Sequence, residues 1–409
     1  MKGIRILACT LCATLLFTAS VSAKTVIIDT ESGESAEELM SLEVPKSLSE
    51  VVSTAAGTAL EVGGKSAVLM ELSSGQVLFE KNTHEKLPIA SVTKIMTLLL
   101  VMEALDKGMI DLQDPVTCSA EAASMGGSQI WLEPGEIMTV HELIKAAAVV
   151  SANDACAALA EHVAGSIEEF VQRMNTRAAE LGMQDTLFKD CSGLDDTAYS
   201  CAYDVALMSR ELMMHPLIKN YTTIWMDTLR NGESQLVNTN KLIRFYQGAT
   251  GLKTGTTSTA GHNLSATAER NGLGFVAVIL GCSTTDERFG GARKLLDHGF
   301  ANYALYTPQI DPDTLIPIPV LRGTAESVTV ESGDLSPILV KKGEEKELSC
   351  TVTLSEDLEA PVTKGQIVGA VTVSREEKTI AEYAVRAAEE VPRLSFGVCL
   401  LRLFTALSA

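Results

Sequence analysis

The sequence predicts an α+β protein, in which a domain of helices packed on an antiparallel sheet is followed by a small all-β domain. Three observations support this fold class. Strand-like segments flank a helical middle between residues 61 and 306, which favours a sheet whose first and last strands meet. Four prolines between 308 and 319 mark a boundary. Beyond them, residues 312–390 change to short alternating strands, as in a β-sandwich.

The N-terminal part indicates export. Lys2 and Arg5 precede an apolar stretch, and small residues end at Ala23, so residues 1–23 are expected to be a cleaved signal peptide. Residues 24–60 are rich in acidic and small residues and are interpreted as a linker. The formal net charge of −19 argues against nucleic acid as a partner.

The first domain opens with a hairpin and a helix. Strands are expected at 66–72 and 76–80, on either side of Ser73-Ser74-Gly75. A helix follows, because apolar residues at 95, 98, 99, 102 and 105 recur at helical spacing. Further helices are expected at 140–150, 155–163, 167–182 and 203–214, and strands at 248–257, 263–269 and 274–281, followed by a helix at 288–303. Asn271-Gly272, between the last two strands, is a strong hairpin signal.

The C-terminal part holds the β domain and an apolar tail. Strands are expected at 326–330, 346–353 and 367–373. The tail, residues 391–409, is shorter than the roughly 20 residues that a membrane-spanning helix needs. As a helix it could make a peripheral contact in a membrane interface. The alternative is a terminal helix docked on the β domain.

Cysteine and histidine usage predicts neither a disulfide framework nor a metal. Two of the nine cysteines fall in the signal peptide, and the other seven are scattered and contain no C-x-x-C, although one pair stays open. The six histidines show no metal-ligand spacing. We therefore expect no metal and no cofactor.

Ser91-Val92-Thr93-Lys94 opens the predicted helix at 95–105. Its serine and lysine lie one turn apart on one face. A desolvated amine loses its proton and can accept the proton of a neighbouring hydroxyl, which makes the serine a nucleophile. On its own the motif could equally be an N-cap serine beside a solvated lysine.

Two further motifs change that balance. Ser151-Ala152-Asn153 lies between two predicted helices, and Lys253-Thr254-Gly255 lies in a late strand. Together and in this order, the three motifs are typical of the penicillin-recognising serine enzymes.

The chain therefore resembles the low-molecular-mass penicillin-binding proteins that act as serine D-alanyl-D-alanine carboxypeptidases. The resemblance covers residues 60–305 and includes Gly251–Thr257 and Ala260–Leu264, and the β domain with its apolar tail is similar to that family's C-terminal half. It implies a β-lactamase/transpeptidase-like catalytic domain that removes the terminal D-alanine from peptidoglycan pentapeptide stems. It also implies inhibition by β-lactam antibiotics and action at the cell wall or the outer face of the cytoplasmic membrane.

The resemblance assigns roles residue by residue. Ser91 would form the acyl-enzyme, Lys94 would act as its base, and Ser151 would relay a proton to the leaving amine. Lys253 would keep the site positive. The backbone N–H groups of Ser91 and Thr256 would form the oxyanion hole. The implied substrate-binding residues are Asn153, Lys253, Thr254, Gly255, Thr256 and Arg288.

Some features depart from the pattern or stay without a role. Residues 253 and 254 of a regular strand point to opposite faces, so both reach one site only if an edge strand is approached obliquely. His262 stands where the family commonly has tyrosine. The turn at 190–194 resembles one in relatives, but no role follows for it.

Two other functions stay open. A serine β-lactamase shares the three motifs but needs a group that activates the deacylating water, for which Glu180 and Glu233 are available. A non-catalytic wall-binding or β-lactam-sensing protein is the other alternative, although Ser91 and Lys94 are both intact.

Overall fold

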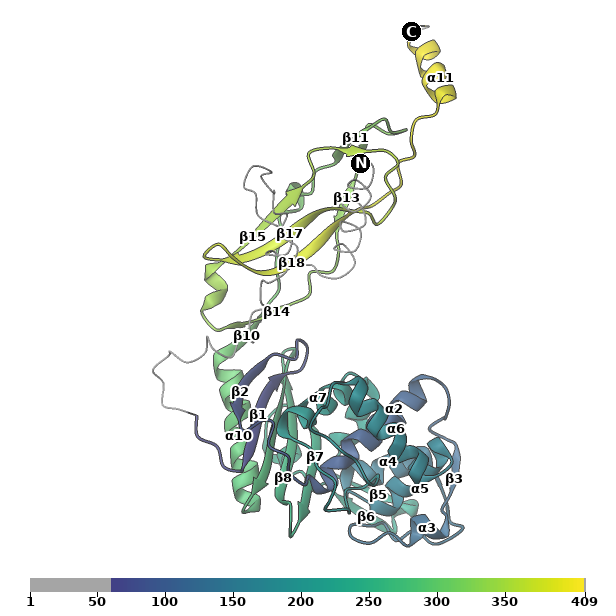
Figure 1. The fold of residues 1–409 in the computed structure, drawn as a ribbon, viewed down its shortest axis with the longest axis vertical. Helices are drawn as coiled ribbons and strands as arrows, with labels where there is room; N and C mark the ends of the chain where they lie inside the picture. Colours follow the sequence, from purple (N-terminus) through teal and green to yellow (C-terminus); the bar gives the residue numbers. More distant parts are fainter. Residues whose placement is uncertain (1–59, 408–409) are drawn as a thin grey trace, which may run out of the picture. The chain divides into compact units, whose positions relative to one another are not determined.

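The computed structural model describes residues 60–407, so the expected signal peptide and all of the linker except Leu60 lie outside the described residues. The described chain forms two compact units. The first contains Leu60–Thr307 together with Ser336–Lys346, and the second contains Pro308–Leu335 and the chain from Glu347 onwards. Figure 1 shows the elements of both units.

A five-stranded antiparallel sheet organises the first unit, with the strand order β2-β1-β9-β8-β7. β1 (Ser66–Glu71) pairs with β9 (Leu273–Cys282), so the first and last strands meet as the sequence predicts. The other strands are β2 (Val77–Lys81), β7 (Ala249–Thr257) and β8 (Gly261–Arg270). Asn271 and Gly272 both have positive φ, as a tight hairpin turn between β8 and β9 requires.

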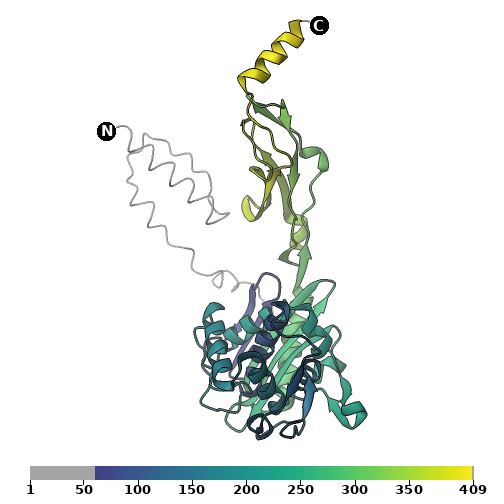
Figure 2. The ribbon, with the colours of Figure 1, turned by 90° about the vertical axis from the view of Figure 1, so that its right-hand side faces the viewer.

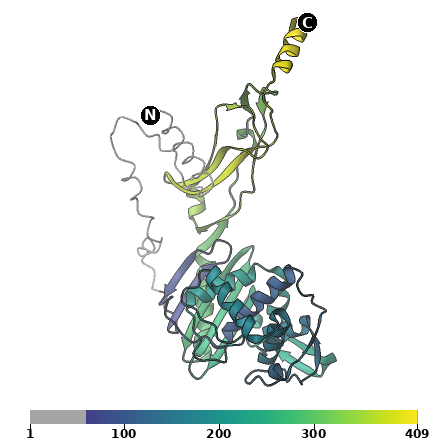
Figure 3. The same ribbon diagram turned by 45° about the vertical axis from the view of Figure 1, so that its right-hand side comes forward.

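Helices cover both faces of this sheet. Alternate residues of β9 belong to different cores, because successive side chains point to opposite faces. Val276, Val278 and Leu280 join the large core formed with the helical part of the unit. Phe275 and Ile279 join a second core with α10 (Thr285–Asn302). Figure 1 shows α10 on one side of the strands and α2, α4, α5 and α6 on the other, and Figures 2 and 3 show the same ribbon from two other directions.

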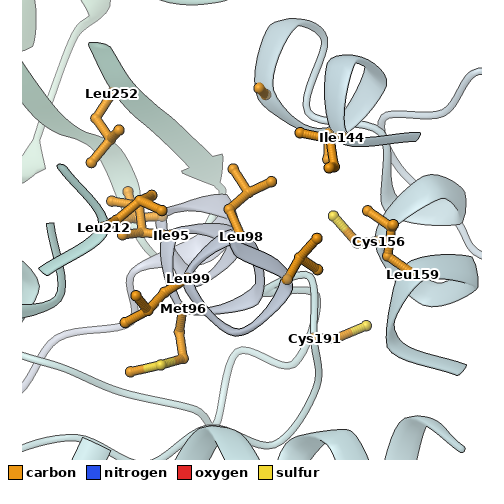
Figure 4. Packing of buried hydrophobic residues seen from close by; sticks show 14 of the residues in the cluster. Ile95, Met96, Leu98, Leu99, Ile144, Cys156, Leu159, Cys191, Leu212 and Leu252 are labelled. Atoms are coloured by element: carbon orange, nitrogen blue, oxygen red, sulfur yellow. The ribbon is translucent and has the colours of Figure 1, made fainter. Parts of the chain in front are cut away.

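Helix α2 (Lys94–Asp106) runs through the middle of the large core. It is buried on almost every side, where the sequence pattern predicts one apolar face. Ile95, Met96, Leu98 and Leu99 point in different directions around its axis, and all four are buried (Figure 4). Burying such a side chain contributes about 1.5–3 kcal/mol each. The residue that begins this helix, Lys94, is therefore held on a firmly packed support.

The remaining predicted helices of the first unit are present, with boundaries that differ from the predicted ones by at most three residues. α10 begins at Thr285, with the Thr284 hydroxyl accepting a hydrogen bond from the Glu287 N–H at 3.1 Å. Arg288 consequently lies inside the first turn. The others are α4 (Val140–Val149), α5 (Asn153–Ala164), α6 (Ile167–Glu180) and α7 (Ala202–Met213).

Several short elements of the first unit have no counterpart in the sequence patterns. β3 (Pro115–Thr117) pairs with β4 (Ile137–Thr139), and β5 (Met226–Leu229) pairs with β6 (Ser234–Val237). β10 (Tyr303–Tyr306) pairs with β14 (Ile338–Lys341). Short helices complete the unit: α3 (Ala120–Ala123), α8 (Lys219–Thr222) and α9 (Leu242–Phe245).

The second unit contains two sheets that share one apolar core. One sheet has the order β12-β11-β16 and the other β13-β18-β17-β15. Ile318 of the first sheet and Val371 and Val385 of the second belong to the same buried cluster. The strands are β11 (Ile318–Leu321), β12 (Ser327–Val328), β13 (Val330–Ser332), β15 (Leu348–Leu354), β16 (Leu358–Glu359), β17 (Ile367–Arg375) and β18 (Lys378–Ala387).

The chain ends in α11 (Phe396–Leu407). Its apolar side chains Phe396, Phe404 and Leu407 are exposed. Among the described residues, none of the helices combines the length and apolar character needed to cross a bilayer.

Candidate active site

Ser91 lies in a short 3-10 turn, Ala90–Thr93, that leads directly into α2. Ala90 has φ +50°, and the turn is packed against two glycines. A Cβ on Gly193 would lie 1.9 Å from the Ala90 carbonyl oxygen. A Cβ on Gly255 would lie 2.5 Å from the Ile89 oxygen and 3.1 Å from the Ser91 nitrogen. Because both positions are glycine, the turn that contains Gly193 and the strand that contains Gly255 can both pack closely against the serine turn.

Lys94 brings the first two motifs together. Its Nζ lies 3.0 Å from the Ser91 Oγ, and it donates hydrogen bonds to the Asn153 Oδ1 at 2.5 Å and the Ser192 carbonyl oxygen at 2.6 Å. The Asn153 Nδ2 in turn donates to the Gly126 carbonyl at 2.6 Å, which fixes the orientation of the amide. Both Asn153 Oδ1 and Ser192 O can only accept hydrogen bonds.

This arrangement suits a neutral amine. A neutral lysine has two N–H donors and one lone pair. The two acceptors use both donors, and the lone pair is left facing the Ser91 hydroxyl. The side chain is fully buried, and this burial lowers the pKa of Lys94 from its usual 10.5, although nearby acidic groups such as Asp190 and Asp154 oppose the shift. The three contacts accommodate a neutral amine, and burial favours this form, in which Lys94 can accept a proton.

Ser151 completes the second motif. It lies just before α5 in a left-handed backbone conformation, with φ +66°. Its Oγ is buried and makes no hydrogen bond among the described residues. A buried hydroxyl without a partner costs free energy, which suggests that a ligand supplies its partner.

Strand β7 carries the third motif and is an edge strand of the sheet. The Lys253 side chain is buried near Lys94, and its Nζ donates to the Thr254 carbonyl at 3.1 Å. The Thr254 hydroxyl donates to the Thr239 hydroxyl at 2.8 Å. Burial is the main cause that lowers the pKa of Lys253 well below 10.5, and Lys94 lowers it further whenever that neighbouring amine is protonated. Burial therefore works against the expected role of Lys253 as the positive charge of the site.

Arg288 supplies a cation at the end of β7. Its Nη1 donates to the Thr256 Oγ1 at 3.1 Å and to the carbonyl oxygens of Gly255 at 3.4 Å and Asn263 at 3.3 Å. Its Nε is buried and makes no hydrogen bond within residues 60–407. The Nδ1 of His262 lies 3.4 Å from the same Thr256 hydroxyl. This group is suited to an anionic ligand.

Several contributors to the site were missed by the sequence analysis. Ser192 acts through its backbone carbonyl, which no motif reveals. Asp190 shapes its turn by accepting hydrogen bonds from the N–H groups of Ser192 at 2.6 Å and of Gly193. Asn263 donates to the Pro88 carbonyl at 3.1 Å, which ties β8 to the segment before Ser91. The Asp-x-x-Gly pattern at 190–193 was the available signal, because it is typical of a tight turn.

The two glutamates considered for a β-lactamase lie on the surface. Glu180 is exposed and pairs with Arg177 at 3.3 Å. Glu233 is exposed in the β5–β6 connection. Within the described residues, neither forms a hydrogen bond with Ser91, Lys94 or Asn153.

One group of metal-type side chains lies elsewhere in the first unit. The ligand atoms of His84, Asp185 and Cys201 are all within 4.8 Å of one another. Asp185 is already paired with His84 at 3.0 Å and with Lys86 at 3.4 Å. The Cys201 sulfur accepts the hydrogen bond that caps α7. These partners account for the cluster without a metal ion.

Comparison with known proteins identifies two matching regions. Residues 52–284 match the family described as D-alanyl-D-alanine carboxypeptidase. Residues 312–393 match the family described as Penicillin-binding protein 5, C-terminal domain.

Individual relatives agree with these matches. The D-alanyl-D-alanine carboxypeptidase DacF of Bacillus subtilis (strain 168) is 42% identical over 343 residues, which cover 83% of this chain and 88% of that protein. The structure of penicillin binding protein 5 from Haemophilus influenzae is 30% identical with a TM-score of 0.69, covering 81% of this chain and 98% of that chain. Penicillin-Binding Protein D2 from Listeria monocytogenes, in its ampicillin-bound form, is 32% identical with a TM-score of 0.54, covering 59% and 99%. The predicted fold class is confirmed.

Gly193 offers a test of the geometry around Ser91. We expect Gly193→Ala to slow acylation of Ser91 by a small thioester by about 100-fold, because the new Cβ must push the Ala90 carbonyl and the serine turn aside. The acyl adduct is followed by intact-protein mass spectrometry. Gly182→Ala is the matched control, since Gly182 also has positive φ but has open space around its Cβ position. Equal acylation rates in the two folded variants would contradict this role of Gly193.

Proposed function

Since this chain belongs to the D-alanyl-D-alanine carboxypeptidase family, we propose that the three motifs carry out that family's reaction with the residues described above. The protein is a serine D-alanyl-D-alanine carboxypeptidase of the penicillin-binding proteins. It hydrolyses the terminal D-alanine from peptidoglycan pentapeptide stems, outside the cytoplasm. One observation carries the residue assignments. The Ser91 hydroxyl lies 3.0 Å from the Lys94 amine, which also donates hydrogen bonds to Asn153 Oδ1 and to the Ser192 carbonyl oxygen.

Acylation begins at Ser91. Its Oγ attacks the carbonyl carbon of the penultimate D-alanine, and Lys94 accepts the hydroxyl proton. The resulting oxyanion accepts hydrogen bonds from the backbone N–H groups of Ser91 and Thr256, each worth about 3 kcal/mol of the barrier. The tetrahedral intermediate then expels the D-alanine amine, which takes a proton from Lys94 through the Ser151 hydroxyl. Hydrolysis of the acyl-enzyme returns Ser91 to its starting state.

Two groups of residues orient the substrate, one at its terminal carboxylate and one at the backbone of the stem. Arg288 and Thr256 receive the terminal carboxylate, since their group combines a buried cation with a hydroxyl donor. Thr254, also on β7, can add a second hydroxyl when its hydrogen bond to Thr239 is exchanged for one to the substrate. Gly255 lets this strand lie close to the serine turn, so that both line the same substrate site. Asn153 binds a backbone amide of the stem, in addition to accepting the hydrogen bond from Lys94. Lys253 completes the buried polar floor of the site.

β-lactam antibiotics are expected to acylate the same serine. The ampicillin-bound relative supports this partner. A β-lactamase would have to hydrolyse that adduct rapidly. Among the described residues no carboxylate hydrogen-bonds to Ser91 or Lys94 to activate such a water, so we expect a long-lived adduct. A purely non-catalytic binding role is disfavoured by the intact serine–lysine pair.

We propose the following division of the chain. Residues 1–23 are a signal peptide that exports the protein, 24–60 are a linker, and 61–306 are the peptidase domain. Residues 312–390 are a β-sandwich, and 391–409 are a tail that rests on the outer face of the cytoplasmic membrane. The exposed apolar side chains of α11 support the last assignment.

Substitution of the nucleophile tests the assignment most simply. Ser91→Ala should abolish D-alanine release from diacetyl-Lys-D-Ala-D-Ala and also the benzylpenicillin adduct, because both need the serine oxygen. Lys94→Ala should slow both reactions severely while leaving Ser91 present. The two readouts are a D-alanine assay and intact-protein mass spectrometry. A folded Ser91→Ala protein that still released D-alanine would refute the mechanism.

The membrane contact has its own test. Phe404→Glu should lower binding of the protein to phospholipid vesicles by tenfold or more, since burial of a phenylalanine contributes about 1.5–3 kcal/mol. Binding is measured by co-sedimentation. Leu321→Glu is the control, because Leu321 is an exposed apolar residue of β11 outside the tail. If both variants bound vesicles like the unmodified protein, the tail would not be the anchor.

A further inference from the structure

A cavity of about 650 Å³ lies beside the site described above and takes no part in the proposed reaction. Its walls come from the loop that follows Gly126 and from the β5–β6 hairpin. They are formed by Ile130, Trp131, Glu133, Glu136, Arg230 and Ser234, with Pro134 and Gly135.

Trp131 is the unusual residue of this cavity. It is 76% exposed, and its φ of +60° is uncommon for a bulky side chain. Its neighbours Ile130 and Leu132 are buried, and their N–H groups both donate to the buried carboxylate of Asp154, at 3.1 and 3.0 Å. These anchors on both sides force the indole outwards. A strained backbone that presents a large aromatic ring to solvent suggests a binding role.

The polar wall of the cavity is rigid. Arg230 donates to both carboxylate oxygens of Glu136, at 2.7 and 3.0 Å, to the Ile130 carbonyl at 2.9 Å and to the Ser234 hydroxyl at 3.0 Å. Its charge is therefore neutralised. The Glu133 carboxylate makes no hydrogen bond with the rest of residues 60–407, so it remains available as an acceptor. An open aromatic face beside neutralised charges and free acceptors suits an uncharged ligand rich in hydroxyl groups.

The cavity lies within reach of the reacting end of the substrate. The Asn153 N–H donates to the Ser128 carbonyl at 2.7 Å, and Trp131 follows Ser128 by three residues, at most about 11 Å of extended chain. The three stem residues between the penultimate D-alanine and the sugar span roughly 10 to 11 Å when extended. The sugar-bearing end of a bound stem can therefore reach Trp131.

We propose that this cavity is a subsite for the glycan strand of peptidoglycan, in which the apolar face of a pyranose ring stacks on the Trp131 indole. Glu133 accepts hydrogen bonds from sugar hydroxyls, and Arg230 keeps the loop and the hairpin together. The inference rests on the proposed function, since it identifies the part of the same polymer that the enzyme recognises beside the stem.

A disaccharide-pentapeptide and the same pentapeptide without its disaccharide differ only in the sugar and test the proposal. Trp131→Ala should lower kcat/KM roughly five- to tenfold on the disaccharide-pentapeptide, mainly through KM, and leave kcat/KM on the free pentapeptide unchanged. Phe245→Ala is the matched control, because Phe245 is an exposed aromatic outside the cavity. The activity of the wild-type protein on diacetyl-Lys-D-Ala-D-Ala tests the proposed function separately. The proposed function and the glycan subsite can therefore fail independently.

A binding measurement complements the kinetics. The chain has two tryptophans, so a Trp225→Phe variant reports on Trp131 alone. Its fluorescence should change when a peptide-free GlcNAc–MurNAc tetrasaccharide is added. The proposal is overturned if Trp131→Ala affects both substrates equally or neither, or if the tetrasaccharide leaves the fluorescence unchanged at millimolar concentration. The proposal is also overturned if Glu133→Gln weakens the binding only of sugar-free stem peptides that have a free side-chain amine. That result would mean that Glu133 binds the peptide and not the sugar.

Discussion

The proposed chemistry of this protein depends on one buried amine. Lys94 has two obligate acceptors, the Asn153 side-chain oxygen and the Ser192 carbonyl, which leave its lone pair for the Ser91 hydroxyl. Burial disfavours the charged form of the same group. A mobile or solvated lysine would stay protonated near neutral pH and could not act as a base. The surrounding residues exclude water from this amine and fix its orientation.

The fold supplies that support from segments far apart in the chain. Helix α2 is packed on nearly all sides, so Lys94 at its first residue has little freedom to move (Figure 4). Asn153 begins α5, and the carbonyl of Ser192 comes from a turn shaped by Asp190. Gly193 and Gly255 allow that turn and β7 to approach the serine turn closely. A sheet with helices on both faces brings all of these segments to one place.

Much of this architecture could be predicted from the sequence, because its signals are local. The period of apolar residues predicts α2, and Asn271-Gly272 predicts the turn between β8 and β9. The three motifs predict which side chains carry the chemistry. The roles of Ser192 and Asn263 could not be predicted, since they depend on backbone carbonyls and on contacts between distant segments. The burial of Lys253 was also missed, because burial on a strand is a tertiary property that spacing does not reveal.

The most direct test of the account is the pH dependence of Ser91 acylation by benzylpenicillin. Lys94 accepts the proton only when neutral, so the rate should fall as the pH is lowered through the pKa of the buried amine. Because burial lowers that pKa, the midpoint should lie below 10.5, the usual value for lysine. Lys253 is coupled to Lys94, so the observed midpoint belongs to the pair. A midpoint at or above 10.5, or a rate that does not change with pH, would contradict the central role of a neutral Lys94.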